Sequence, residues 1–209
     1  EPLGIRKLEL DAQHGLRING EQVKLRGTCI HHDNGIIGAA TLEKAEERRC
    51  RQMKEAGFNS IRSSHHPMSK AMLDACDKYG MLVMDELSDM WTKHKNPNDY
   101  ALYFLEHVDA EVKSMVKKDY NHPSVVLYSA GNEIPDLGRP RGAQINRHIC
   151  NLFHEMDPYR FTTNAINGML AAGAKMGLIM KDVMAEMEKM KAAQPEEKEE
   201  EGASALNSM

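Results

Sequence analysis

Apolar and polar positions follow two different patterns along the chain. Residues 4–10 alternate as in a half-exposed strand. Two further short stretches, residues 16–20 and 23–27, are joined through an Asn-Gly step at 19–20, which is a strong hairpin signal. Beyond residue 24, short apolar runs are separated by longer segments in which apolar positions recur at helical spacing. We therefore expect a small antiparallel region followed by strands that alternate with helices.

The alternating region predicts a parallel sheet. Thr41 is expected to cap the first helix, and Gly57 and Gly80 are expected to end the first two helices. Strands that alternate with helices imply right-handed crossovers, which leaves a barrel or a doubly wound sheet. The expected strands are residues 24–29, 59–62, 81–84, 125–128 and 161–165, and the expected helices are residues 42–56, 70–79, 102–120 and 142–156.

Polar side chains gather where the expected strands end, and this distribution separates the two folds. No Gly-x-Gly-x-x-Gly or other phosphate-binding loop follows the first strand, so a nucleotide-binding fold is disfavoured. A (β/α)₈ barrel instead collects its active site from the carboxyl ends of several strands. The polar groups at these ends are His31, His32 and Asp33; Arg62, His65 and His66; Asp85 and Glu86; and Asn132 and Glu133.

The end of the fourth of these strands carries the leading candidate. Val125 to Tyr128 form an apolar run after an Asn-His-Pro breaker, as expected of a strand buried on both faces. Asn132 and Glu133 follow just past its end. An amide and a carboxylate at this edge of a sheet are suited to catalysis, although a lone Glu is more often a solvated loop residue.

Two stretches resemble the family 2 glycoside hydrolases, the β-galactosidase and β-glucuronidase family. The first runs Asn-His-Pro-Ser, four apolar or aromatic residues, Ser, Ala and Gly-Asn-Glu at 121–133. The second is Asn-Ser-Ile-Arg-Ser-Ser-His-His-Pro at 59–67, followed by Asp-Lys-Tyr-Gly at 77–80. Tyr128 stands where the family usually has Trp, and His66 where it usually has Tyr. The resemblance covers roughly residues 4–167.

This resemblance implies a retaining β-glycoside hydrolase, with β-galactosidase the most frequent specificity in the family. Glu133 would be the catalytic acid/base and Asn132 would bind the substrate. Arg62 would orient the nucleophile, and His65 would contact the sugar. The other substrate-binding candidates are His32, Asp33 and Glu86, the last two near the sugar hydroxyls. The resemblance implies a carbohydrate partner, and we expect no cofactor.

The family's nucleophile has no counterpart in the sequence. It is a Glu on the seventh barrel strand, whereas no strand is evident after Ala165. Such barrels need about 250 residues, and this chain has 209. We expect residues 21–167 to be a partial barrel of about five βα units, inactive alone, and residues 1–20 to end an upstream β-sandwich or linker. A non-catalytic carbohydrate-binding or scaffold module is the alternative.

The last part of the chain has a different composition. Methionines at near-helical spacing predict an amphipathic helix over residues 168–194, with the spacing evident from 174 to 193. A Met stripe of this kind is more often a packing face than a ligand-binding groove. Residues 195–209 are acidic and are expected to be disordered. An exposed Met face and an open sheet edge would favour a homo-oligomer.

Charge and cysteine content narrow the remaining functions. The net charge of −4, without a basic stripe, gives no support to nucleic-acid binding, and no apolar run suits a membrane span. Nor does a signal peptide begin at Glu1, although a periplasmic or secreted parent is compatible with the sequence. The cysteines, which are expected to be buried free thiols, are Cys29, Cys50, Cys76 and Cys150.

A metal site is the competing interpretation of the histidines. Barrel hydrolases that bind metals place His-x-His on the first strand, but His31 and His32 are adjacent. Neighbours in a strand point to opposite faces, so only His31 and Asp33 could point the same way. We therefore expect no metal, and one of the two histidines is expected to be a hydrogen-bonded core or rim residue.

Overall fold

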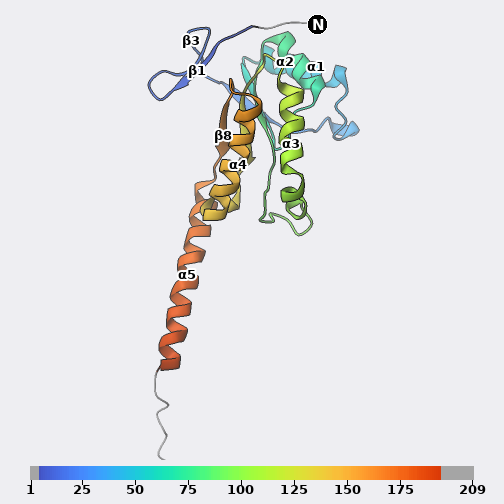
Figure 1. Cartoon of the computed structure of the whole chain (residues 1–209). Helices are drawn as coiled ribbons and strands as arrows, with labels where there is room; N and C mark the ends of the chain where they lie inside the picture. The colour runs from blue at the N-terminus through green and yellow to red at the C-terminus, as the bar shows by residue number, and fades with distance from the viewer. Residues whose placement is uncertain (1–4, 194–209) are drawn as a thin grey trace, which may run out of the picture. The chain divides into compact units, whose positions relative to one another are not determined.

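The computed structural model describes residues 5–193 and divides the chain into two compact units, Glu1–Ala174 and Lys175–Met209. The first unit contains a parallel sheet, the helices that connect its strands, and a small antiparallel sheet (Figure 1). Helix α5 (Gly168–Ala193) begins in the first unit and continues into the second.

Five parallel strands form the main sheet in the order β4-β5-β6-β7-β8. Strands that are consecutive in sequence are also neighbours in the sheet, as in a (β/α)₈ barrel, whereas a doubly wound sheet reverses its order at a switch point. This sheet confirms the expected α/β barrel class and its five strands. The strands are β4 (Gly27–Ile30), β5 (Ser60–Ser63), β6 (Leu82–Glu86), β7 (Val125–Asn132) and β8 (Phe161–Ala165).

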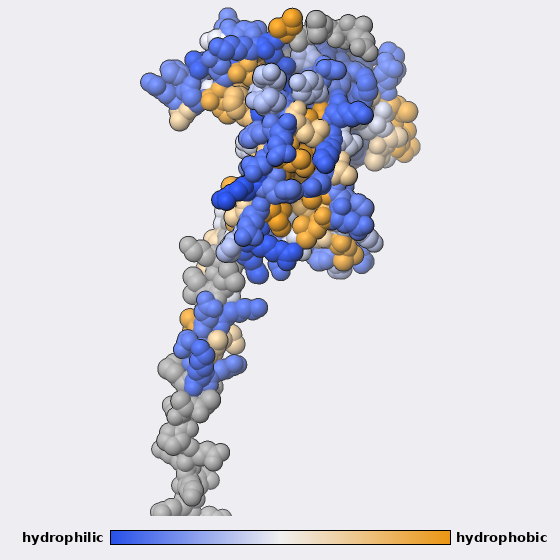
Figure 2. Space-filling model, viewed as in Figure 1, coloured by the Kyte–Doolittle hydropathy of each residue, from blue (hydrophilic) through white to orange (hydrophobic). Residues whose placement is uncertain are grey.

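Four helices connect these strands and pack in pairs, α1 with α2 and α3 with α4. Apolar side chains show between the polar outer faces of α3 and α4 (Figure 2). Three short 3₁₀ turns lie in the loops between strands and helices. The helices are α1 (Glu43–Glu55), α2 (Lys70–Tyr79), α3 (Phe104–Asp119) and α4 (Pro140–Met156), and the turns are η1 (Gly35–Ile37), η2 (Tyr100–Leu102) and η3 (Pro135–Gly138).

The ends of α2 show why its bounds match the sequence prediction. The Ser69 side chain accepts a hydrogen bond from the Met72 backbone N–H, and Gly80 ends the helix in the left-handed conformation, with a φ of 65°. The prediction for α1 was wrong at its start. Leu42 is the N-cap and its side chain makes no capping bond, so Thr41 lies one residue too early to cap the helix.

The two family motifs meet at the amino ends of the strands. Asp77, at the end of α2, accepts a 2.9 Å hydrogen bond from the backbone N–H of Ser124 and lies 2.6 Å from Nδ1 of His122. His122 is almost completely buried, so this contact gives its ring nitrogen a partner at the amino ends of the strands. Asp77 and His122 therefore have a structural role, far from the carboxyl ends of the strands.

The amino-terminal region forms the second sheet, with strands β1 (Leu8–Asp11), β2 (Gly15–Ile18) and β3 (Glu21–Gln22). The Asn-Gly step makes the expected tight turn, because both Asn19 (φ 54°) and Gly20 (φ 86°) are left-handed. Residues 23–27 do not form the predicted strand, since pairing ends at Gln22 and β4 begins at Gly27. Assignment of this region to an upstream β-sandwich stays a prediction.

The carboxyl-terminal helix was predicted over residues 168–194, and α5 spans Gly168–Ala193 in agreement with that prediction. Its described methionines are exposed: Met169, Met176, Met180, Met184 and Met187. Self-association through this face stays a prediction, and the predicted acidic tail lies outside the described residues. Among residues 5–193, no helix has the length and apolar character needed to cross a bilayer.

Candidate active site

A buried ion pair between neighbouring strands forms the base of the site. Nη2 of Arg62, on β5, lies 2.8 Å from both carboxylate oxygens of Glu86, at the end of β6. Ser129 of β7 also donates a hydrogen bond to Glu86, at 2.7 Å. The Glu86 side chain is 0% exposed and that of Arg62 is 22% exposed. Glu86 therefore ties three strands together beneath the surface of the site.

Burial and pairing act against each other on Arg62. Burial favours the neutral guanidine, but hydrogen bonds and charge attraction from Glu86 outweigh it and raise the pKa of Arg62 above its ordinary value. The guanidinium therefore stays charged and fixed in orientation. Because Arg62 Nη2 also donates to Oδ1 of Asn132 at 2.6 Å, the ion pair orients the amide at the end of β7.

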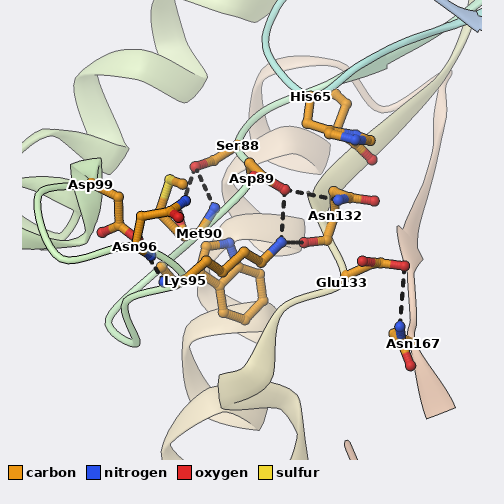
Figure 3. Close-up of polar contacts among 12 residues, drawn as sticks. His65, Ser88, Asp89, Met90, Lys95, Asn96, Asp99, Asn132, Glu133 and Asn167 are labelled. Atoms are coloured by element: carbon orange, nitrogen blue, oxygen red, sulfur yellow. Dashed lines mark hydrogen bonds and ion pairs between the residues drawn. The ribbon is translucent and has the colours of Figure 1, made fainter. Parts of the chain in front are cut away.

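The same amide is held on its other side by a second ion pair (Figure 3). Nδ2 of Asn132 donates to Oδ1 of Asp89 at 2.8 Å, and the Lys95 ammonium lies 2.7 Å from that oxygen. Lys95 also donates to the backbone carbonyl of Asn132 at 2.8 Å. Partial burial would raise the pKa of Asp89, but Lys95 and Asn132 outweigh burial and lower it. Both ends of the Asn132 amide are thus engaged.

The segment that carries Asp89 and Lys95 is fixed by its own hydrogen bonds. Ser88 donates to the carbonyl of Met90 at 2.7 Å, and the Asp99 carboxylate accepts from the backbone N–H groups of Lys95 at 2.6 Å and Asn96 at 2.9 Å. Figure 3 shows these residues grouped on one side of Asn132. These hydrogen bonds hold the segment between β6 and η2 in one conformation, and so position Asp89 and Lys95, although the segment has no regular secondary structure.

Glu133 faces away from this network. Its φ of 46° is left-handed, an uncommon conformation for a non-glycine residue that concentrates at functional sites. Its backbone N–H donates to the carbonyl of Ala165 on β8, at 2.6 Å, and its Oε1 accepts a 3.2 Å hydrogen bond from Asn167 (Figure 3). Glu133 is exposed. The chain thus turns at the strand end so that a solvent-accessible carboxylate stands beside a fixed amide.

A glycine is required just before these two residues. A Cβ at Gly131 would come within 2.8 Å of the Ile134 side chain and 3.1 Å of the Trp91 indole nitrogen. Trp91 is fully buried and donates to the Ala130 carbonyl at 3.1 Å. Close packing on both sides of Gly131 therefore explains the Gly in Gly-Asn-Glu and fixes the backbone on which Asn132 and Glu133 stand.

The histidines of the site have different surroundings. Nδ1 of His65 lies 2.8 Å from Oε1 of Glu86, and the His31 ring packs edge-on against His65, with ring centroids 5.2 Å apart. His66 keeps contact with solvent, but neighbouring groups displace part of the water around its ring, and this desolvation lowers the pKa of His66. His31 and His65 thus form a rim above the buried carboxylate.

His32 and Asp33 lie at the end of β4, outside the Arg62 network. His32 is half-buried. Asp33 is exposed, and its carboxylate accepts from the backbone N–H of Gly35 at 2.9 Å, which stabilises its own loop. The structure therefore gives Asp33 a local contact, and a role for either residue in sugar binding stays a prediction.

Tyr128 fills the core, as its place inside the strand predicted. Its ring is fully buried and stacks on Phe153 with centroids 4.8 Å apart. Its hydroxyl donates to Asp157 at 3.2 Å, and burial raises its pKa far above the ordinary value for tyrosine. The residue that departs from the family pattern therefore packs against α4, away from Asn132 and Glu133.

The structure brings together most of the predicted site and adds residues that sequence reasoning missed. Asn132 is the last residue of β7, so the strand extends past residue 128 and the prediction that Asn132 follows its end was wrong. Glu86 is buried beneath Arg62 and His65. The missed residues are Asp89, Lys95, Ser129 and Asn167. Asp89 follows the end of β6 by three residues, which is the signal that could have identified it.

The comparisons with known proteins identify the family of this fold. The sequence model of the family described as "Glycosyl hydrolases family 2, TIM barrel domain" matches residues 10–205. This match continues past residue 167, where we expected the resemblance to fade. A family 2 glycosyl hydrolase from Bacteroides cellulosilyticus has a similar structure, with a TM-score of 0.77 and 43% identity over 79% of this chain and 21% of its own.

Two relatives of known activity are a β-galactosidase and a β-glucuronidase. A β-galactosidase from Bacteroides ovatus is 47% identical over 133 residues, which are 64% of this chain and 16% of the relative. A β-glucuronidase from Bacteroides fragilis is 29% identical over 174 residues, 80% of this chain and 24% of the relative. The chain thus spans less than a quarter of the length of either relative. It belongs to glycosyl hydrolase family 2 and contains part of the TIM barrel domain of that family.

Proposed function

We propose that this chain is the acid/base-carrying part of a retaining β-glycosidase, with Glu133 as the acid/base. The observation that carries the proposal is that Asn132 and Glu133 stand next to each other at the end of β7. Asn132 is held from two sides by Arg62 and Asp89, whereas Glu133 is exposed beside it. A fixed amide beside an accessible carboxylate suits substrate binding and proton transfer.

Retaining hydrolysis divides the chemistry between two carboxyl groups about 5 Å apart. Glu133 protonates the leaving oxygen, and a second carboxylate attacks the anomeric carbon. Glu133 then removes a proton from the water that releases the sugar. Asn132 would hydrogen-bond a sugar hydroxyl, and Arg62, fixed by Glu86, would orient the attacking carboxylate. The Glu133 carboxylate thus acts twice, first as acid and then as base.

The attacking carboxylate is proposed to lie outside this chain. The carboxylates that meet at Asn132 and Arg62 are already engaged, because Glu86 is buried under Arg62 and Asp89 is paired with Lys95. An ion-paired, buried carboxylate is a poor nucleophile for an approaching sugar. We therefore propose that the isolated chain is inactive and that later strands of a longer polypeptide supply the nucleophile.

A β-galactoside is the proposed substrate. The β-galactosidase relative shares 47% of its aligned residues with the chain, against 29% for the β-glucuronidase relative. The contacts of Asn132 and Glu133 come from β5, from the segment after β6, and from β8 and the residues just after it. These contacts would act on features that all these sugars share. Loops outside the chain would then select the sugar.

Hydrolysis of aryl β-galactosides and aryl β-glucuronides by the purified 209-residue chain and its Glu133→Gln variant tests this proposal. No turnover by either folded protein is expected, since the nucleophile is absent. Turnover that is lost in Glu133→Gln would show that the second carboxylate is supplied within these residues or by a neighbouring subunit. That result would keep Glu133 as acid/base but overturn the proposal of an inactive chain.

A further inference from the structure

Two cysteines face each other between the first two helices. Sγ of Cys50, on α1, lies 3.9 Å from Sγ of Cys76, on α2, although the residues are 26 positions apart. Both are 0% exposed. The helices pack side by side, as Figure 1 shows. Cys29 is exposed and Cys150 is half-buried, which corrects the expectation that all four thiols are buried.

The contact gives the two thiols different ionisation and sets the distance that a bond between them must close. The contact with Cys76 lowers the pKa of the Cys50 thiol, whereas the same contact and burial raise the pKa of Cys76 well above its ordinary value. A disulfide has a sulfur-to-sulfur distance of about 2 Å. The two sulfurs, 3.9 Å apart, therefore need to approach by about 2 Å in total for the bond to form.

We propose that Cys50 and Cys76 form a disulfide that joins α1 to α2 when the chain meets a low-molecular-weight disulfide such as oxidised glutathione. The Cys50 thiolate attacks one sulfur of the oxidant and releases a first glutathione thiolate. The Cys76 thiolate then attacks the Cys50 sulfur and releases the second. The two thiol protons pass to the two glutathione thiolates, so one oxidant is reduced and the chain loses two hydrogens.

The reaction takes place while the helix contact is open, because neither sulfur is accessible in the folded chain. Refolding in the presence of the oxidant provides that opening. The bond then joins the helices that precede and follow β5 in the sequence, and β5 is the strand that carries Arg62. Because the bond closes a long loop in the unfolded chain, it is expected to raise the Tm by about 10 °C.

The test uses the full chain with Cys29→Ser and Cys150→Ser, which leaves only the pair. The chain is unfolded, reduced and refolded with oxidised and reduced glutathione, and its intact mass and unreduced peptides are measured. We expect a product lighter by two hydrogens, one peptide pair linked through Cys50 and Cys76, and a Tm that falls by about 10 °C on reduction. Adding Cys50→Ser is expected to abolish both the link and the Tm difference.

A folded product with both thiols free, or with glutathione on each, would overturn the proposal. So would a linked chain that melts below its reduced form. If the serine variants fail to fold, alkylation of the refolded natural chain gives the same answer. Cys29 and Cys150 then react at once, and Cys50 and Cys76 react only after unfolding and reduction. Reaction of the pair after unfolding alone would show that no disulfide had formed. The outcome is independent of glycosidase activity.

Discussion

Arg62 donates a 2.6 Å hydrogen bond to the Oδ1 atom of Asn132, which is 70 residues away in the sequence. This bond joins β5 to β7 at the carboxyl ends of the strands. It links the two motifs through functional groups, just as the pair of Asp77 and His122 links them at the opposite end. The Asn132 amide is therefore oriented by a charge that Glu86 holds in place.

Removing Arg62 is expected to destabilise the chain and not only the site. In Arg62→Ala the Glu86 carboxylate stays buried without its main cation, which typically costs about 3 kcal/mol of unfolding free energy. Arg62→Lys keeps a charge but loses the two-pronged contact, so its loss should be smaller. Urea unfolding measures both. Arg51→Ala, which removes an exposed ion pair with Glu55, is the control and should resemble the natural chain. Equal stability of all the variants would show that Glu86 does not depend on Arg62.

Lys95 is expected to matter for catalysis although it lies beside the site. Lys95→Met leaves Asp89 without its cation and frees the Asn132 carbonyl, so the amide loses its fixed position. In a polypeptide that joins this chain to the remaining barrel strands, kcat/KM should fall about 10²-fold. Steady-state kinetics measure the fall, and Lys93→Met is the control because Lys93 is exposed. An effect of similar size in both variants would contradict a positioning role for Lys95.

Gly142 is expected to tolerate no side chain. A Cβ there would lie 1.9 Å from the carbonyl oxygen of Asp136, in the turn that follows Glu133. Helix propensity alone would favour alanine by about 1 kcal/mol, but overpacking against backbone should make Gly142→Ala less stable by about 3 kcal/mol. Gly173→Ala is the control, since a Cβ there has nothing within 4 Å. Chemical denaturation that finds Gly142→Ala as stable as Gly173→Ala would contradict the close approach.

Asp119 should make the stability of the chain depend on pH. Burial and the neighbouring Asp85 carboxylate raise the pKa of Asp119 to about 9, and the shared Lys118 ammonium offsets only part of this effect. The folded chain then holds a proton that the unfolded chain releases near pH 4. This contribution is full below that pH and is lost as the pH rises towards about 9.

Asp119→Asn keeps the shape and removes this titration. Unfolding free energies measured between pH 5 and pH 9 should therefore fall more steeply with pH for the natural chain than for Asp119→Asn. Lys118 remains paired with Asp85 in both proteins. Parallel pH profiles would show that Asp119 is ionised in the folded chain at neutral pH.

The sequence predicted best those elements that have clear end signals. The bounds of α2 and β8 agree with the structure, and Gly80 ends α2 as expected. The end of β7 was missed because Ser129 and Gly131 are polar or small, so the apolar run stops at Tyr128. Ser129 nevertheless belongs inside the sheet, where it donates to the buried Glu86. Local hydrophobicity cannot reveal a polar residue whose partner lies on another strand.

The candidate site was only partly predictable, because only some of its residues stand in recognisable motifs. Arg62, Asn132 and Glu133 stand in motifs, whereas Asp89 and Lys95 lie in an irregular segment without periodicity or a tight sequence pattern. Their roles depend on a fold of residues 88–99 that is set by Ser88 and Asp99. The contact between Cys50 and Cys76 likewise depends on helix packing, which their spacing does not show.

The most direct test of Glu133 compares two leaving groups in a polypeptide that carries the whole barrel. Glu133→Gln and the natural sequence are assayed with an aryl β-galactoside whose phenol is a poor leaving group and one whose phenol is a good one. We predict a fall in kcat/KM of about 10²- to 10⁴-fold for the poor leaving group and a much smaller fall for the good one, which needs no proton. Unchanged hydrolysis of both substrates, or equal losses on both, would contradict Glu133 as the catalytic acid.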